Sequence, residues 1–394
     1  MRDKAWAGPS SHAEESRGGA MKFLQQERAV LEELLPGLDS AISGFELMEM
    51  ERPGNPSIIT YREHGGPGLL IPKRFGGRGS TPLQAIRAQR AIASRAPSLA
   101  VATTMHHFTI ATVLEIDPER PEREGELLQS IARENLYVGS GFAEGRPGAS
   151  IQSATIRVEP GPEGFMVLNG SKKPCSLSHS MDLFTVSTPP LEGMDAGLAA
   201  AMIPADTPGI ERRPFWKSPI LAGAESDEVV LHDVMVPEEM FIPLGGPGRV
   251  SAVQDRGFLW FELLISASYL GITSALVERV LRSGRGGPSE RVELATEVEG
   301  AMAALEGIAR GMESGEKGNH ELGRLLLVRY SVQSAIDRAA CLAVELLGGN
   351  AFIGSAEVSY LFSAARGLSL HPPARTGTGK RLDEYLTGRP FVLD

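Results

Sequence analysis

The sequence predicts an α+β protein in which a central β domain separates two helical domains. Apolar residues recur at three- and four-residue steps in the first and last parts of the chain, and they alternate with polar residues in the middle part. We divide the 394 residues into a solvated tail (1–20), an N-terminal helical domain (21–136), a central β domain (137–245) and a C-terminal helical domain (246–394). This order lacks the strand–helix alternation of a dinucleotide-binding fold.

The N-terminal domain is expected to be helical because its apolar positions fall on one face. Leu83, Ile86 and Ile92 illustrate this spacing. Residues 68–79 are rich in glycine, so we expect them to form a loop between two helices. Residues 1–20 have no apolar run and therefore do not resemble a secretory signal.

Alternation of apolar and polar residues predicts a β-hairpin in the central domain, with strands at 154–159 and 165–169 around a turn at 160–164. Prolines and glycines separate further short segments of the same kind, which is typical of a small antiparallel sandwich or barrel. These further strand candidates are residues 182–186, 198–203 and 228–236.

The C-terminal domain is expected to consist of long helices. The first, residues 258–281, is apolar nearly all round, which indicates deep burial or a subunit contact. Its uncharged run from Leu263 to Val277 is shorter than the roughly 20 residues that cross a bilayer, so a buried helix is expected. The remaining helix candidates are residues 291–312, 322–347 and, after a break at Gly348 and Gly349, 358–368.

The composition excludes several classes of function. With 39 basic and 49 acidic residues, the net charge of -10 disfavours nucleic acid and anionic membranes as partners. The two cysteines, Cys175 and Cys341, lie far apart, and the eight histidines show no metal-ligand spacing. Neither a disulfide framework nor a metal site is therefore expected, and a cytoplasmic location is favoured.

Several well-known catalytic motifs are absent from the sequence, including HExxH, GxSxG and a GxGxxG that follows a strand. The run from Thr376 to Lys380 is similar to a phosphate-binding loop. However, Ala374 stands where glycine is required, and Arg381 stands where Ser or Thr would hold Mg²⁺. We expect this run to be a solvated basic loop.

Two segments carry a family resemblance most clearly: residues 167–176 (VLNGSKKPCS) in the β domain and residues 345–350 (ELLGGN) after a long helix. Residues 68–79, 139–150 and 228–237 add to it, in the same order along the chain. From about residue 22 to 370 the chain resembles the acyl-CoA dehydrogenase superfamily. The resemblance implies a flavin, FAD or alternatively FMN, between the β domain and the C-terminal helices.

The resemblance also implies which residues hold the flavin. The backbone of Phe142 and Ala143 would face the flavin pyrimidine ring, and the hydroxyl of Ser176 would face flavin N5. Gly348 and Gly349 would let the backbone approach the flavin pyrophosphate closely, because no Cβ intervenes.

The chain departs from the family pattern near the flavin. Pro174 stands where most members have Trp, Ala143 where they have Thr, and Glu345 where they have Gln. The last change would bring a negative charge close to a pyrophosphate. These departures weaken the expectation of tightly bound FAD.

The usual catalytic glutamate of the superfamily is missing. In most members it follows the Gly-Gly turn, where this sequence has Pro372. A minority take it from the first long C-terminal helix, where Glu262 adjoins the matching position, Phe261. Burial in the apolar stretch LWFELLISA would raise the pKa of Glu262, as a base requires. Pairing with an arginine, or exposure at the helix start, is the alternative.

We therefore expect an acyl-CoA dehydrogenase-type enzyme. Glu262 would remove the α-proton of an acyl thioester while a hydride passes from its β-carbon to flavin N5. The substrate would be an acyl-CoA or acyl-carrier protein in a biosynthetic pathway, and the electron acceptor an electron-transfer flavoprotein or O₂. The resemblance implies a homodimer or homotetramer built on the C-terminal helices.

Two alternatives stay open. The first is a two-component monooxygenase on the same fold that uses reduced flavin and O₂. In that case His371, in the loop after the Gly-Gly turn, and His106 or His107 would hydrogen-bond and protonate the reacting oxygen. The second is a flavin-binding protein without turnover that associates with nucleic acid, which the acidic charge disfavours.

Overall fold

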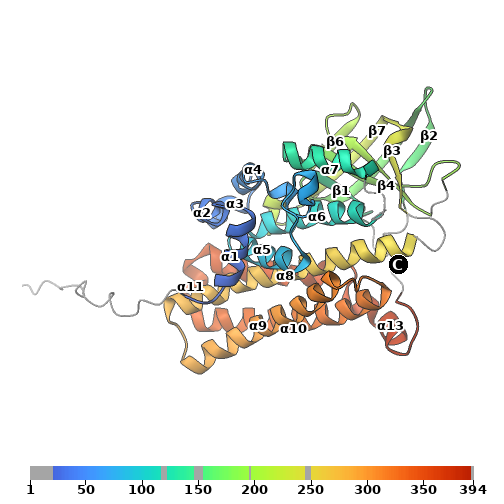
Figure 1. The fold of residues 1–394 in the computed structure, drawn as a ribbon. Coiled ribbons are helices and arrows are strands. Elements are labelled where there is room, and N and C mark those ends of the chain that lie inside the picture. The colour runs from blue at the N-terminus through green and yellow to red at the C-terminus, as the bar shows by residue number, and fades with distance from the viewer. Residues whose placement is uncertain (1–20, 117–121, 146–153, 195–196, 245–249, 392–394) are drawn as a thin grey trace, which may run out of the picture.

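The structure, a computed structural model, describes residues 21–116, 122–145, 154–194, 197–244 and 250–391. Helices, then strands, then helices follow one another along the chain (Figure 1), so the predicted fold class is confirmed. The expected tail, residues 1–20, lies outside the described residues, as do residues 146–150 of one segment that carries the family resemblance.

The N-terminal part folds into helices that bury one apolar face. α5 begins with a capping box in which the Thr81 hydroxyl accepts from the Gln84 N–H and the Gln84 side chain accepts from the Thr81 N–H. Ile86 and Ile92 on this helix are fully buried, as their spacing predicted. The described helices here are α1 (Gln25–Leu34), α2 (Leu38–Ser43), α3 (Leu47–Met50), α4 (Pro56–Glu63), α5 (Pro82–Ala93), α6 (Pro97–Ile116) and α7 (Glu122–Glu134).

The central part forms two four-stranded sheets that pack face to face around an apolar core. The predicted hairpin is confirmed, since β2 and β3 pair antiparallel with Arg157 opposite Asn169. One sheet has the order β1 (Val138–Gly141), β4 (Leu183–Thr188), β5 (Ala199–Pro204), β8 (Phe241–Pro243). The other has the order β2 (Arg157–Pro160), β3 (Phe165–Cys175), β7 (Asp227–Pro237), β6 (Ile210–Arg213).

The expectation of an antiparallel arrangement is wrong for one pair of strands. β1 and β4 run parallel, with Val138 opposite Leu183. Parallel neighbours need a crossover connection, and here the chain crosses to the other sheet as β2 and β3 before it returns as β4.

The C-terminal part is a bundle around α8, which packs against α5, α6, α9, α10 and α12. Figure 1 shows α8 running between the N-terminal helices and the pair α9 and α10. α8 is longer than the predicted 258–281. The described helices here are α8 (Val250–Ser283), α9 (Pro288–Glu313), α10 (Asn319–Leu347), α11 (Gly349–Gly354), α12 (Ala356–Ala365) and α13 (Arg375–Leu386).

The expected basic loop from Thr376 to Lys380 is wrong, because these residues lie in α13. Leu382 and Tyr385 on this helix pack against Leu322 and its neighbours on α10. This apolar contact outweighs the low helix propensity of the two glycines in the run.

Two described helices, Pro97–Ile116 and Val253–Ser283, are long and apolar enough to cross a bilayer by length and composition. Their most apolar windows are 83% and 100% buried within the protein, which is typical of core helices.

Candidate active site

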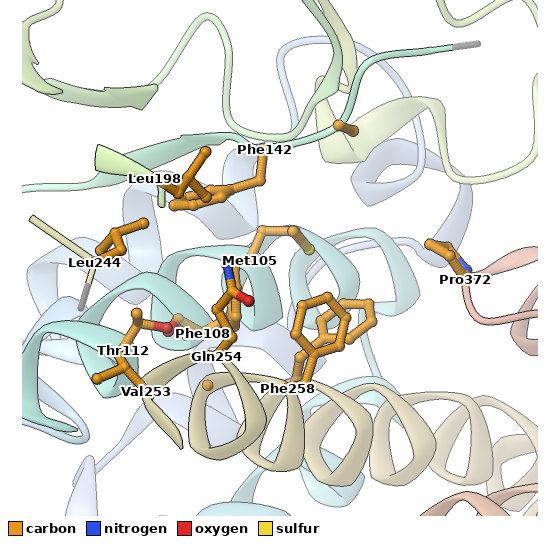
Figure 2. Close-up of a pocket in the computed structure, with 13 residues that line it drawn as sticks. Met105, Phe108, Thr112, Phe142, Leu198, Leu244, Val253, Gln254, Phe258 and Pro372 are labelled. Carbon is orange, nitrogen blue, oxygen red and sulfur yellow. The ribbon is translucent and has the colours of Figure 1, made fainter. Parts of the chain in front are cut away.

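An apolar cavity lies where the end of β1 meets helices α6 and α8 (Figure 2). Its volume is about 90 Å³, several times the roughly 10–15 Å³ that one water molecule requires. Met105 and Phe108 come from α6, Phe258 and Phe261 come from α8, and Phe142 follows β1. The cavity therefore suits a small aliphatic or aromatic group.

Phe108 is the centre of an aromatic cluster along the cavity. Its ring centroid lies 5.7 Å from that of Phe142, 6.0 Å from Phe258 and 5.8 Å from Phe261, in edge-to-face geometry. α6 and α8 come close together here because Gly257 has no side chain. A Cβ at this position would lie only 2.6 Å from Thr112 Oγ1, so the glycine sets the spacing of the two helices.

The loop that follows α12 brings His371 to the edge of the cavity. Its neighbour Pro372 lines the cavity, and its own ring centroid lies 6.2 Å from that of Phe261. The ring nitrogen Nε2 shares a 2.9 Å hydrogen bond with the Tyr269 hydroxyl. Burial, together with the nearby Arg329 charge, lowers the pKa of His371 to about 4. The ring is therefore uncharged near neutral pH.

Arg329 on α10 holds this loop in place. Its guanidinium donates to the carbonyl oxygens of Pro373 at 2.8 Å, Leu368 at 2.9 Å and His371 at 2.8 Å. The Arg329 side chain is buried, and its charge is balanced by Glu262, whose Oε2 lies 3.1 Å from Nε. The ion pair thus positions the His371 loop against α8.

Glu262 does not reach the cavity where the proposed base was expected. Its side chain is fully buried, but it faces Arg329 and does not belong to the cavity lining. Burial raises the pKa of Glu262 to about 7, and the Arg329 guanidinium opposes that rise. A base must come within hydrogen-bond reach of the proton it removes. The carboxylate is instead placed to balance the charge of Arg329.

The neighbouring histidines of α6 hold structural positions away from the cavity lining. The His106 Nδ1 accepts from the Val138 N–H at 3.0 Å, and its Nε2 donates to the Pro67 carbonyl at 2.9 Å. The His107 Nε2 shares a 2.8 Å hydrogen bond with the Tyr61 hydroxyl. Burial lowers the pKa of both rings. These contacts do not support a role for either ring at a flavin.

Two of the three flavin contacts expected in the β domain line the cavity. Phe142 and Ala143 line it, and the Ala143 carbonyl accepts from the Lys173 N–H at 3.0 Å. Ser176 is buried after β3, where its hydroxyl shares a 2.9 Å hydrogen bond with that of Ser226. Because two hydroxyls share one bond, one O–H is left to donate to a flavin carbonyl or ring nitrogen. These residues fit a flavin.

The turn at Gly348 and Gly349 lies far from the cavity of its own chain. Gly348 has a φ of +83°, a left-handed conformation that favours glycine at the end of α10. α10 begins beside the first turns of α8, where the Asn319 amide donates to Asp255 at 3.0 Å. From there its 29 residues extend about 43 Å to the turn. Figure 1 accordingly shows α11 at the far end of the helical domain.

Tyr269, Arg329 and Gln254, which is a polar residue of the cavity lining, were not predicted from the sequence. Arg329 could have been found, because it is the lone charge in LLLVRYSV and complements the lone charge Glu262 in LWFELL. Buried charges on apolar helices need opposite partners. No sequence signal shows which way Tyr269 or Gln254 points.

A scan against models of known protein families gives no match. The chain is 43% identical over 380 residues to isobutylamine N-hydroxylase of Streptomyces viridifaciens, which covers 95% of this chain and 100% of that protein. It is 28% identical over 246 residues to dibenzothiophene monooxygenase of Rhodococcus erythropolis, covering 59% of this chain and 57% of that protein. TdsC of Paenibacillus sp. A11-2, solved with FMN and indole, matches with a TM-score of 0.78 at 20% identity. This match covers 93% of the present chain and 98% of TdsC, and it shows a shared fold.

These similarities correct the expected function. Isobutylamine N-hydroxylase matches over its full length at 43% identity, and the more distant dibenzothiophene relative is a monooxygenase, so the expectation of an acyl-thioester dehydrogenase is wrong. The role of Glu262 as an α-proton base falls with that reaction, and the acyl-CoA or acyl-carrier-protein substrate loses its support. The broader expectation of a flavin-dependent oxidoreductase is retained.

Proposed function

Because the chain belongs to the family of isobutylamine N-hydroxylase, within the acyl-CoA dehydrogenase superfamily, we propose that it is a flavin-dependent monooxygenase that hydroxylates the nitrogen of a small primary amine. The 43% identity along 95% of the chain supports this function. The structural observation that carries it is the cavity, which is apolar, has a volume of about 90 Å³ and has no carboxylate in its described lining. An alkyl group of a few carbons suits such a space.

The proposed reaction converts a primary amine, O₂ and reduced flavin into a hydroxylamine, water and oxidised flavin. One oxygen atom enters the new N–O bond and the other leaves as water. A bound reduced flavin, either FADH₂ or FMNH₂, supplies the two electrons for this reaction. We propose that a separate reductase delivers the reduced flavin, so that this protein is the oxygenase of a two-component system.

The residues of this chain would hold the flavin, exclude water and move a proton. Phe142, Ala143 and Ser176 would contact the flavin, and the apolar cavity wall keeps water from the reacting atoms. The uncharged His371 ring adjoins the cavity beside Pro372, and once its loop brings it within hydrogen-bond reach of the substrate it would accept the proton that the amine nitrogen loses as its N–O bond forms. Tyr269 and Arg329 keep that ring and its loop in position.

We also propose a homo-oligomer, either a dimer or a tetramer. The resemblance assigns Gly348 and Gly349 to a flavin, and the turn lies far from the cavity of its own chain. A Cβ added at either glycine would meet no atom within 4 Å, so the backbone there is open to a second subunit. Light scattering on the purified protein tests this, and a monomer would count against it.

A reductase-coupled assay tests the proposed function. The purified protein receives NADH, a flavin reductase, FAD or FMN, and isobutylamine, and the products are identified by mass spectrometry. We expect the hydroxylamine to form only with the reductase and O₂, and to persist when catalase removes hydrogen peroxide. The absence of any N-oxidised product from small primary amines would overturn the proposal, as would anaerobic bleaching of the flavin by an acyl-CoA.

A further inference from the structure

We propose that the side-chain amide of Gln254 binds the nitrogen of the substrate amine, and that the site selects the uncharged amine over the ammonium ion. This inference rests on the proposed function and identifies the group that recognises the substrate. Gln254 lies in the first turns of α8 and points from that helix toward Phe142 (Figure 2). Its Oε1 is buried and has no hydrogen-bond partner among the described residues.

An amide oxygen without a partner in the wall of an apolar cavity favours a ligand that donates a hydrogen bond, provided that the Gln254 side chain rotates to turn this oxygen toward the cavity. Such an oxygen has lost its hydrogen bonds to water and forms none with the protein. Its burial therefore costs free energy until a ligand N–H donates to it in place of water. The other polar side chain in the described lining is Thr112, whose hydroxyl already donates to the Phe108 carbonyl at 2.9 Å. Thr112 Oγ1 keeps lone pairs that can also accept, but Gln254 Oε1 is the side-chain acceptor of the described lining that has no hydrogen-bond partner, so a ligand N–H relieves the larger cost there.

The charges around the cavity favour the uncharged amine. An ammonium ion would lose its hydration here without meeting a carboxylate, because the described lining contains none. The ionisable groups on the surrounding elements already have partners: Glu115 pairs with Arg256 and Lys317, Asp255 accepts from Asn319, Glu262 pairs with Arg329, Glu144 pairs with Lys172, and His371 shares a hydrogen bond with Tyr269.

The uncharged amine is also the form that can react. It donates an N–H to Gln254 Oε1 while its nitrogen lone pair stays available for the N–O bond. An ammonium ion has no lone pair, so a site that bound it firmly would hold the substrate in an unreactive state. Recognition by a neutral amide therefore agrees with the chemistry of N-hydroxylation.

Selection of the uncharged amine predicts a steep pH dependence of binding. An alkylammonium ion loses its proton near pH 10.4, as lysine does, so only about one molecule in 10³ is uncharged at pH 7.4. The apparent affinity for total isobutylamine should therefore rise about tenfold for each pH unit between roughly pH 7 and 9. A fluorinated amine of low basicity, already uncharged at neutral pH, should bind with nearly constant affinity.

Calorimetry on the full-length protein measures this binding without turnover. Gln254→Leu keeps the size of the side chain and removes the acceptor, so it should weaken binding of the uncharged amine roughly 3- to 10-fold. Gln254→Glu provides a carboxylate for the ammonium ion and should flatten the pH dependence. Gln129→Leu, at an exposed position on α7, is the matched control and should bind like the wild type. Circular dichroism checks that every variant is folded.

The outcomes separate this inference from the proposed function. The inference is overturned if isobutylamine does not bind, if its wild-type affinity is independent of pH, or if Gln254→Leu binds as well as the wild type. If the amine binds with the expected pH dependence through Gln254 but no hydroxylamine forms, the inference stands and the proposed function fails. If hydroxylamine forms although Gln254→Leu leaves binding unchanged, only the inference fails.

Discussion

Replacing Arg329 with methionine should destabilise the folded protein by about 3–5 kcal/mol, the usual cost of removing one partner of a buried ion pair. Both Arg329 and Glu262 are fully buried, with 3.1 Å between Nε and Oε2, and burial raises the pKa of Glu262 to about 7. Well above pH 7, where Glu262 is ionised in the wild type, the substitution leaves a buried carboxyl group that either stays charged without a partner or must take up a proton. It also removes the donor to three carbonyl groups of the His371 loop. That loop is partly exposed and water can replace the lost bonds, so we expect the charge effect to dominate.

A double variant separates the two effects. Arg329→Met combined with Glu262→Leu removes both charges, and buried ion pairs can often be replaced by apolar residues without loss. We therefore expect the double variant to recover at least half of the stability that the single variant loses. Its His371 loop should still be loosened, which would lower the rate of hydroxylamine formation.

Urea denaturation followed by circular dichroism measures these free energies of unfolding. A loss below about 1 kcal/mol for Arg329→Met, the size typical of an exposed ion pair, would show that Arg329 and Glu262 do not form a stabilising buried ion pair. A double variant no more stable than the single variant would show the same, because the buried charge of Glu262 would then not be the cause.

Three further predictions follow from individual contacts. Gly257→Ala would place a Cβ 2.6 Å from Thr112 Oγ1, so it should lower stability by about 1–3 kcal/mol in thermal unfolding and weaken amine binding. His371→Gln should reduce hydroxylamine formation by roughly 10²-fold or more in the coupled assay, with flavin affinity unchanged in fluorescence titration; an unaltered rate would exclude proton transfer by this ring. Burial raises the pKa of Glu262 from 4.5 to about 7, so between these two pH values the folded protein keeps a proton that the unfolded chain has lost. The contribution of the protonated Glu262 to the free energy of unfolding is therefore fully present below pH 4.5 and is lost as the pH rises through 7. Urea titrations should therefore show Glu262→Gln gaining up to about 3 kcal/mol relative to the wild type across this interval, and a constant difference would refute this.

The fold could be predicted from the sequence because its signals are local. Residues 154–159 and 165–169 alternate around a turn and pair as β2 and β3, although β2 spans only Arg157–Pro160, and the long helices bury continuous apolar faces. The parallel pairing of β1 with β4 could not be predicted, because it depends on where the chain returns after β2 and β3. The helix at Arg375–Leu386 was missed because it is stabilised by packing on α10, which its glycine-containing sequence does not reveal.

The site was predictable only in part. The burial of Glu262 was predictable from its apolar neighbours. The direction in which its side chain points was not, because α8 is apolar nearly all round and has no polar face that would show its orientation. The loop position of His371 came from the family resemblance and not from spacing. Gln254 lies in the polar segment VSAVQDRG, which gives no sign that one amide turns inward. Contacts across α6, α8 and α10 decide all three directions.

In the proposed reaction this chain transfers one atom of O₂ to the nitrogen of a small amine held in the apolar cavity. The most direct test supplies O₂ labelled with the heavy oxygen isotope to the protein, a flavin reductase, flavin, NADH and isobutylamine, and records the mass of the product. We predict an isobutylhydroxylamine that carries one heavy oxygen atom. Unchanged isobutylamine, with all the labelled O₂ reduced to hydrogen peroxide and water, would contradict the proposal.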